Sequence, residues 1–456
     1  MMITDSLRKE KIEMNLDRNR VVRMFVCGPT VQDKIHIGHA RTYIFFDVLA
    51  RYIRSRGYDL FYLQNITDVD DRIIKKSREE GISAEEVASR NLNLYREILS
   101  SIGINSINFF ARATLFMDEI RDQVARLLSK GHAYRTSDGI YFRISSFPEF
   151  GRLSGQSLES LISGARIAPN ENKEDYRDFV IWKLRKEGEP FWESPFGQGR
   201  PGWHIEDTAI TESFFGPTYD IHGGGSDLQF PHHEAEIAIE RSISGEEYLA
   251  RFWIHTGMVN IRNEKMSKSL GNSVYVSDLL KSYSGSEIRM ALLKSGYRST
   301  INFSQDMLDE AKLNSTGLTT LFRKLKNSKP GKGIDNFRTG WIERMQEFLD
   351  DDMDTRGAII ALNEFSSYIN SNLDNISQDQ REYAIKVLQW SYDILGIFDL
   401  NPDSGSPNSL IESMIDLRNS MRKKKDFHSA DMIREKLREG GVYVEDRGDT
   451  TVWWIE

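Results

Sequence analysis

Apolar residues near the N-terminus are spaced in a way that predicts alternating strands and helices. Residues 21–27 form a largely apolar run of strand length, and Gly28-Pro29 ends it. Apolar residues then recur at helical spacing over 38–56, and residues 59–67 have the pattern of a second buried strand. A capping box opens a further helix over 83–102. This alternation predicts a βαβ unit and a parallel sheet.

The pattern changes between residues 112 and 201. A helix ends at Gly131, a hairpin turns at Asp138-Gly139, and a long stretch rich in Gly, Ser and Pro follows. Strand-like segments resume at 219–222 and 252–256. We therefore predict that 112–201 is an α+β connective insertion. It would divide the first domain into two halves, 1–111 and 202–303.

The last third of the chain has the pattern of amphipathic helices. Residues 304–400 are predicted to form a helical bundle with loops at 328–333 and 350–355. Residues 401–407 read as a linker, and a helical hairpin with a β-hairpin turning at Gly448-Asp449 completes a small domain over 401–456. The predicted fold class is α/β: a Rossmann-like parallel-sheet domain with an insertion, then a helical bundle and a small C-terminal α+β domain.

Composition favours a cytoplasmic protein. The chain has 456 residues, of which 39% are hydrophobic, and no apolar run reaches the roughly 18 residues of a membrane span. The charged N-terminus has no apolar stretch typical of a signal sequence. A single cysteine, Cys27, excludes an intramolecular disulfide, which suits a reducing compartment.

The net charge of −8 argues against a protein that coats nucleic acid nonspecifically. Residues 418–438 nevertheless contain eight Lys or Arg against three acids, a local charge of +5. Considered alone, such a run is more often a solvated helix face than a binding surface.

The sequence His36-Ile37-Gly38-His39 lies between the first strand and the first helix. A helix N-terminus offers free N–H groups to a phosphate, and Gly38 has no side chain to block a nucleotide. Capping or packing histidines are an equally good interpretation of this motif in isolation. Lys265-Met-Ser-Lys-Ser269, a loop whose lysines could close over a triphosphate, makes the phosphate site the better one.

A scattered cluster combines metal-ligand chemistry with glycines. It comprises Cys27, the segments 203–207 and 220–225, and the segment 231–236. His232 and Glu236 are four residues apart, so on a helix they share one face, as metal ligands must. The alternative is a helix-surface pair, which we consider weaker because Gly223 to Gly225 permit close approach just upstream.

Together these motifs carry a family resemblance. HIGH at residues 36–39 with KMSKS at 265–269 resembles the class I aminoacyl-tRNA synthetases. The strings FVCGPTV, NITDVDDRI, GRPGWHIE, DIHGGGSDLQFPHHEAEIA and EKMSKSLGN resemble the cysteinyl-tRNA synthetase family over nearly the whole chain. The resemblance implies ATP-dependent activation of L-cysteine, with Mg²⁺ accompanying ATP, and its transfer to the 3′ end of tRNA(Cys). It also implies that the C-terminal domain binds the anticodon, and we expect a monomer.

The resemblance also implies one Zn²⁺ per chain, which the family binds through two Cys, one His and one Glu. Cys27, His232 and Glu236 fall on three of those positions, but Asp207 stands where the family has its second Cys. Asp is an accepted zinc ligand. Asp207 would either bind the metal directly or hydrogen-bond to water that completes a three-ligand site.

The resemblance also implies roles for individual residues that match the family's motifs. In ATP binding and catalysis the resemblance implicates the two signature motifs, with His36, Gly38, His39, Lys265 and Lys268. Contacts to the amino acid fall on Thr67, Trp203, His222 and Asp227. Anticodon contacts fall on Arg422, Asp431 and Asp446.

Two other functions fit parts of this sequence. A related ligase that joins cysteine to a small amino sugar, as in mycothiol synthesis, would lack an anticodon-binding domain, whereas residues 409–455 carry a basic helical hairpin here. A non-catalytic paralogue that only binds RNA or metal would be expected to lose HIGH or KMSKS residues, and both motifs are intact.

Overall fold

The structure is a computed structural model that describes residues 1–156, 173–261, 264–265, 272–400, 407–447 and 450–455. The chain folds into two compact units, Met1–Phe398 and Asp399–Glu456. Each unit is described by itself.

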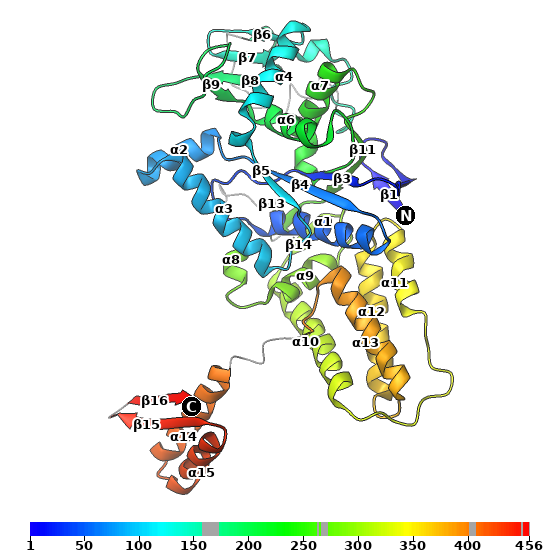
Figure 1. Ribbon diagram of the computed structural model, residues 1–456, viewed down its shortest axis with the longest axis vertical. Coiled ribbons are helices and arrows are strands. Elements are labelled where there is room, and N and C mark those ends of the chain that lie inside the picture. The colour runs from blue at the N-terminus through cyan, green and yellow to red at the C-terminus, as the bar shows by residue number, and fades with distance from the viewer. Residues whose placement is uncertain (157–172, 262–263, 266–271, 401–406, 448–449, 456) are drawn as a thin grey trace. The chain divides into compact units, whose positions relative to one another are not determined.

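A parallel sheet forms the centre of the larger unit (Figure 1). Its strands are β3 (Val22–Val26), β4 (Leu60–Ile66), β5 (Phe109–Arg112), β10 (Tyr219–Gly225) and β11 (Ala250–Thr256). Their spatial order is β11-β10-β3-β4-β5, and every neighbouring pair is parallel. The order of strands reverses between β3 and β10, and open α/β sheets bind ligands beside the carboxyl ends of strands at such a point.

Helix α1 (Ile37–Ser55) follows β3 and is buried over most of its length because both of its apolar stripes pack inward. The other helices of the sheet region are α2 (Asp71–Glu80), α3 (Ala84–Ser101), α6 (Trp203–Phe215) and α7 (Glu234–Ser244). Short helices η1 (Ala113–Leu115), η2 (Ile144–Ser146), η3 (Ser226–Leu228) and η4 (Gln229–His233) complete this part. A β-hairpin of β1 (Met2–Asp5) and β2 (Glu10–Glu13) lies at the N-terminus.

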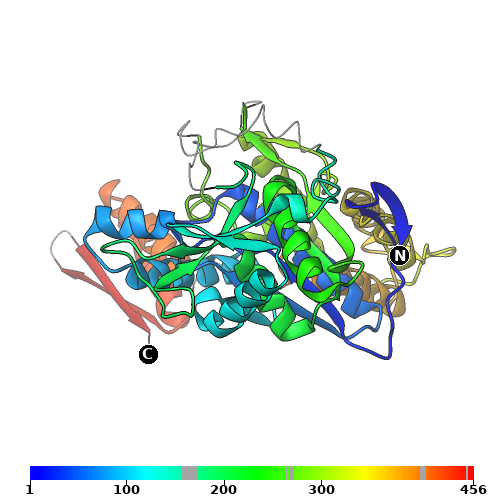
Figure 2. The ribbon, with the colours of Figure 1, turned by 90° about the horizontal axis from the view of Figure 1, so that it is seen from above.

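The insertion contains α4 (Met117–Ser129) and an antiparallel sheet that lies beyond one side of the parallel sheet in Figure 1 and faces the viewer in Figure 2. Its strands are β6 (Ala133–Arg135), β7 (Gly139–Phe142), β8 (Phe179–Leu184) and β9 (Gly199–Pro201), in that spatial order. The hairpin β6–β7 confirms the predicted turn at Asp138-Gly139. Apolar residues of this sheet share one buried core with α6, α7 and β11.

A small three-stranded sheet and a group of helices follow. The strands are β12 (Val259–Ile261), β13 (Glu264–Lys265) and β14 (Ile301–Phe303), with β12 in the middle. The helices are α8 (Val276–Leu279), α9 (Gly285–Leu293), α10 (Gln305–Asn327), α11 (Trp341–Asp350), α12 (Thr355–Asn372) and α13 (Gln378–Leu395). Arg289 on α9 joins these layers: it pairs with Asp47 of α1 at 2.8 Å and donates to the Leu395 carbonyl at the end of α13.

The smaller unit contains α14 (Pro407–Lys423), α15 (Phe427–Glu439), β15 (Val442–Arg447) and β16 (Thr450–Ile455). The two strands pair antiparallel. Among its described residues, the core includes the buried aliphatic residues Ile411, Ile415, Leu437, Val442 and Val444, with Trp453 packed against them. The predicted turn residues 448–449 and most of the predicted linker, 401–406, lie outside the described residues.

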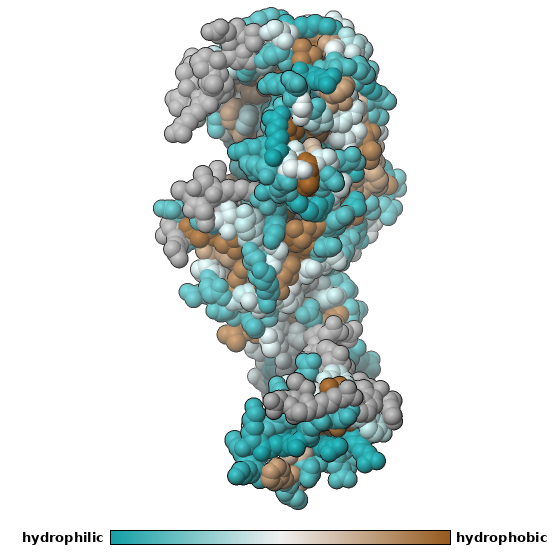
Figure 3. Space-filling view, turned by 90° about the vertical axis from the view of Figure 1, so that its left-hand side faces the viewer, coloured by the Kyte–Doolittle hydropathy of each residue, from teal (hydrophilic) through white to brown (hydrophobic). Residues whose placement is uncertain are grey.

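The predicted α/β fold class is confirmed, and so are the helices after residue 304. Sequence patterns missed the N-terminal hairpin and the short elements α2, β5 and β14. None of the helices in the described part of the chain is long and apolar enough to cross a bilayer. The face shown in Figure 3 is mostly hydrophilic, with apolar residues in scattered patches.

Candidate active site

A cavity of about 490 Å³ opens where the order of strands reverses. It is lined by the loop after β3, the first turn of α1, the start of α6 and the segment after β10. Its lining includes Cys27, His36, Gly38, His39, Trp203 and Asp227, all singled out by the sequence. Motifs nearly 200 residues apart in the chain therefore share one cavity.

The N-terminus of α1 presents the HIGH motif to this cavity. His36 is the N-cap residue, and its backbone N–H donates to His39 Nδ1 at 3.3 Å. The two imidazole rings stack with centroids 3.8 Å apart. The positive end of the helix dipole favours an anion such as a phosphate here.

Arg41, one turn further along α1, connects this helix to the chain segments on the opposite side of the cavity. Its buried guanidinium donates to five backbone carbonyls, those of Gly257, Met258, Gly296, Tyr297 and Ser299. Burial lowers the pKa of Arg41 to about 10. Gly257 and Met258 line the cavity, so Arg41 fixes the two sides of the cavity relative to each other.

The KMSKS motif lies almost wholly outside the described residues. Lys265 ends β13, whose backbone pairs with Asn260 of β12. Lys268 lies in the segment 266–271 that the structure does not describe.

Cys27, which lines the cavity, has its sulfur within 4.8 Å of ligand atoms of Asp207 and His232. Asp207 Oδ2 lies 3.4 Å from Cys27 Sγ and 3.0 Å from His232 Nε2. Glu236 Oε1 lies 3.2 Å from the same His232 nitrogen. Asp207, His232 and Glu236 are fully buried, and Cys27 is 3% exposed. The four predicted ligands therefore form one continuous cluster.

Glu236 also belongs to a second group, with His222 and His233. Glu236 Oε2 lies 3.6 Å from His222 Nε2, and Oε1 lies 3.9 Å from His233 Nε2. His233 Nδ1 in turn contacts His255 at 2.8 Å. Gly224 allows this crowding, since a Cβ there would lie 2.8 Å from the His233 ring.

Burial dominates the electrostatics of this region. It raises the pKa of the Cys27 thiol and the Glu236 carboxyl, and the charge of Asp207 raises both further. Burial lowers the pKa of His204, His222 and His233, and lowers that of His255 to about 3. Without a cation, the thiol and the carboxyl are thus held protonated and these histidines neutral.

The donor set fits a divalent metal ion. One sulfur, one imidazole nitrogen and one carboxylate lie within 4.8 Å of one another, and Glu236 adds a second carboxylate 3.2 Å from the same imidazole nitrogen. Each of these groups is an accepted zinc ligand. The Glu236 oxygens lie buried and form no hydrogen bond within the described part of the chain. A bound cation would let Cys27 and Glu236 ionise and would satisfy these oxygens.

The four residues predicted to contact the amino acid are placed differently. Trp203 and Asp227 line the cavity, and Trp203 stacks on His232 with ring centroids 3.9 Å apart. His222 lies in the second histidine group, where it contacts the Tyr219 hydroxyl at 2.7 Å. Thr67 is buried at the end of β4 beside Glu206, and burial raises the pKa of Glu206.

Sequence reasoning did not assign Asn65, Arg41, His204 or His233. Asn65 Nδ2 donates to Asp207 Oδ1 at 2.5 Å, and His204 Nδ1 lies 2.8 Å from His232 Nδ1. A usable signal existed for Asn65, because it lies near the carboxyl end of a parallel strand. His204 and His233 each neighbour a residue that was assigned.

In the smaller unit, Arg422 and Asp446 lie together while Asp431 is exposed on α15. Asp446 accepts two hydrogen bonds from Arg418, at 2.9 and 2.6 Å, and also pairs with Arg422. Arg418 therefore holds the pKa of Asp446 well below its usual range. Phe427 is 57% exposed, whereas Trp453 packs against the small core.

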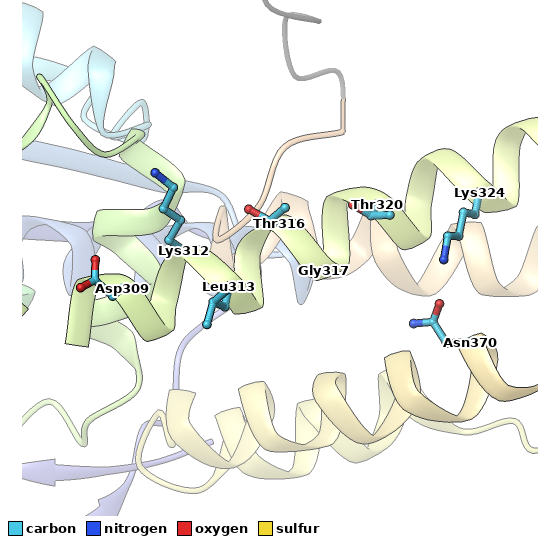
Figure 4. Close-up of a pocket in the computed structure, with 8 residues that line it drawn as sticks. All are labelled: Asp309, Lys312, Leu313, Thr316, Gly317, Thr320, Lys324 and Asn370. Carbon is cyan, nitrogen blue, oxygen red and sulfur yellow. The ribbon is translucent and has the colours of Figure 1, made fainter. Parts of the chain in front are cut away.

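A larger hollow, about 730 Å³, lies along α10 (Figure 4). Lys312, Thr316, Thr320 and Lys324 border it from α10, and Asn370 faces it from α12. It contains none of the residues singled out by the sequence. Volume alone therefore does not identify the reactive site.

Comparisons with known proteins agree with this arrangement. Residues 13–313 match the family model of the class I (C) tRNA synthetase catalytic domain. Residues 344–399 match the DALR domain, and residues 411–453 match the cysteinyl-tRNA ligase anticodon binding domain. A solved methionyl-tRNA synthetase of Mycobacterium tuberculosis, bound to methionyl adenylate, has a TM-score of 0.61 at 16% identity, covering 83% of this chain and 92% of that one. The fold is thus that of a class I aminoacyl-tRNA synthetase.

Relatives with higher sequence identity show which family within this class the chain belongs to. The cysteine–tRNA ligase of Thermoplasma acidophilum is 50% identical over 97% of both chains, and that of Thermoplasma volcanium is 48% identical over the full length of both. The cysteine–tRNA ligase of Thermococcus onnurineus is 38% identical over 99% of this chain and 98% of its own. This chain belongs to the cysteine–tRNA ligase family.

Proposed function

We propose that this enzyme activates L-cysteine with ATP and transfers it to the 3′ end of tRNA(Cys). The observation that carries the proposal is the convergence of a thiol-binding type of metal cluster and a phosphate-binding helix N-terminus on one cavity. The full-length match to cysteine–tRNA ligases supports the same reaction.

The reaction proceeds in two displacements. A carboxylate oxygen of cysteine attacks the α-phosphorus of ATP, which forms cysteinyl adenylate and releases pyrophosphate. A hydroxyl of the terminal ribose of the tRNA then attacks the carbonyl carbon and releases AMP. Neither displacement requires a nucleophilic side chain, so the protein contributes positioning and charge stabilisation.

His36, Gly38 and His39 would hold the phosphates at the N-terminus of α1, with Mg²⁺ accompanying ATP. Lys265 and Lys268 would place positive charge on the departing pyrophosphate. Lys268→Ala should reduce pyrophosphate exchange by about 10²-fold or more, because this charge acts chiefly in the transition state.

Cys27, Asp207, His232 and Glu236 would hold one Zn²⁺. When bound, zinc supplies a site that prefers a substrate thiolate to a hydroxyl, which distinguishes cysteine from serine. Specificity based on a bond that the competitor cannot form reaches ~10⁴-fold. Trp203, stacked on His232, would close the pocket over the side chain.

In the smaller unit, Arg422, Asp431 and Asp446 would contact the unpaired anticodon bases. Asp446 is already paired with Arg418 and Arg422, so its first role would be to orient Arg422. Arg422 is 43% exposed and would donate to base edges. The match of residues 411–453 to an anticodon binding domain favours this reading over a ligase that acts on a small amino sugar.

Pyrophosphate exchange with each of the twenty amino acids, followed by tRNA charging, tests the proposal. Exchange with cysteine and none with serine is expected. Exchange without tRNA charging would leave the amino-sugar ligase as the better function. A protein with no exchange activity that still binds RNA would be a non-catalytic paralogue.

A further inference from the structure

We infer that Asn65 is a positioning residue for the metal site: its amide holds the Asp207 carboxylate so that only Oδ2 faces Cys27 and His232. This inference rests on the proposed function, since it concerns the same cysteine-binding metal.

Both ends of the Asn65 amide are engaged. Its Nδ2 donates to Asp207 Oδ1 at 2.5 Å, and its Oδ1 accepts from the backbone N–H of Gly28 at 2.5 Å. The Gly28 N–H can only donate, so the amide oxygen must face it and the NH₂ group must face Asp207. The side chain is fully buried, which excludes competition from bulk water.

The backbone around Asn65 leaves it little freedom. A Cβ at Gly28 would lie 1.9 Å from the Asn65 carbonyl oxygen, so only glycine permits this approach of the loop after β3 to β4. Gly28 directly follows Cys27, and Asp207 lies on α6. A single amide therefore joins the two chain segments that provide Cys27 and Asp207.

This contact matters because Asp207 is a carboxylate. A thiolate presents one ligand atom, whereas a carboxylate can bind through either oxygen or through both. With Oδ1 bonded to Asn65, Oδ2 is left 3.4 Å from Cys27 Sγ and 3.0 Å from His232 Nε2. Asp207 is thereby made to act as a ligand with one donor atom, as four-coordinate zinc requires.

The single cysteine of this chain gives the test a clean signal. Zinc affinity is measured by competition with a chelator of known affinity, and the alkylation rate of Cys27 at limiting zinc reports metal protection independently of catalysis. Asn65→Ala should weaken zinc binding by roughly 10- to 100-fold, the usual effect of losing an outer hydrogen bond to a ligand. It should expose Cys27 to alkylation in parallel.

Gln64→Met is the matched control. Gln64 is a buried amide on the same strand, but its Oε1 accepts from the Tyr95 hydroxyl. Its substitution should change zinc affinity by less than about threefold, below the effect of an outer hydrogen bond to a ligand. If Asn65→Ala does not fold, Asn65→Asp keeps the shape and sets an oxygen against Asp207 Oδ1, so it should weaken zinc binding as well.

The same substitution in the Asp207→Cys variant distinguishes a positioning role of Asn65 from a general contribution to the stability of the fold. In Asp207→Cys no carboxylate remains for Asn65 to orient. If Asn65 acts through Asp207, the double variant Asp207→Cys/Asn65→Ala should bind zinc less than about threefold more weakly than Asp207→Cys alone. Equal losses in both backgrounds, or unchanged affinity in Asn65→Ala, would overturn the inference and leave the proposed function standing. Wild-type protein that binds no zinc would instead remove the proposed metal site and this inference with it.

Discussion

Two buried or half-buried acid clusters in this molecule are neutralised in opposite ways. In the smaller unit, Asp446 is paired with Arg418 and Arg422 and accepts a further hydrogen bond from Thr451. In the larger unit, Asp207 and Glu236 contact His232, and burial lowers the pKa of the nearby His222 and His233. The described residues give neither acid a Lys or Arg partner. The first cluster contains its own cations, whereas the second would be completed by the metal ion that we propose it binds.

This contrast distinguishes polar groups that stabilise the fold from polar groups that serve the function of the protein. Buried charges cost free energy unless they are paired, so an acid cluster without its own cation lowers the stability of the metal-free fold. We expect substitutions in the paired cluster to reduce stability, and substitutions in the unpaired cluster to reduce function.

The largest effect is expected for Asp207→Ala. Losing one of four ligands should lower cysteine-dependent pyrophosphate exchange by at least ~10³-fold, because both metal binding and thiol selection depend on it. The metal-free variant should unfold at the same temperature as metal-free wild type or higher, since a buried acid is removed. Zinc content, exchange rate and thermal unfolding are measured on the same samples. A variant that loses stability while keeping zinc would remove the contrast.

Removal of the smaller unit should produce the next largest effect. A chain that ends after Leu400 should retain adenylate formation, because the HIGH and KMSKS motifs and the cluster all lie earlier. Charging of tRNA should fall by roughly 10²-fold, since the second attachment point is lost. The salt dependence of tRNA binding should also decrease. Equal charging by both proteins would contradict an anticodon role.

Arg418→Met should mainly destabilise the smaller unit. It removes the bidentate partner of Asp446 and should cost about 2 kcal/mol in that unit, the usual effect of losing hydrogen bonds to a charged group. Hydrogen exchange of residues 407–447 in the full-length protein measures this loss. Lys423→Met, an exposed change on the same helix, is the control and should stay within about 0.5 kcal/mol.

The smallest effect concerns Glu240, a buried acid outside both clusters. Burial and the charge of Glu212 raise the pKa of Glu240 from 4.5 to about 8, so the folded chain keeps a proton that the unfolded chain has released. Stability therefore falls as pH rises from about 4.5 to about 8, and Glu240→Gln should remove that decline.

The pH slope is limited to about 1.4 kcal/mol per pH unit, the value for one proton that the folded chain holds and the unfolded chain releases. Denaturant unfolding at several pH values measures the slope. Glu212→Gln removes the neighbouring charge that helps to raise the pKa of Glu240, so it should reduce the decline without abolishing it. A slope that persists in Glu240→Gln would assign it to another group.

Motifs with strict spacing could be read from the sequence, but contacts between strands could not. Cys27, His36 and His39 follow from a strand, a loop and a helix start that are continuous in the chain. Asn65 could not be foreseen as a partner of Asp207, because this pairing depends on how closely the loop after β3 approaches β4. Likewise β5 has only four residues, one of them the 42% exposed Phe109, so it lacks the alternation that marks longer strands.

The order of strands in the parallel sheet also has a consequence for synthesis on the ribosome. Strand β3 is made early, but its neighbour β10 is separated from it by α1, β4, β5 and the whole insertion. Chains elongate at roughly 5–20 residues per second, so β3 waits many seconds for that edge to be covered. The nascent chain must keep an apolar strand from aggregating through this interval, and chaperone dependence of expression is the expected result.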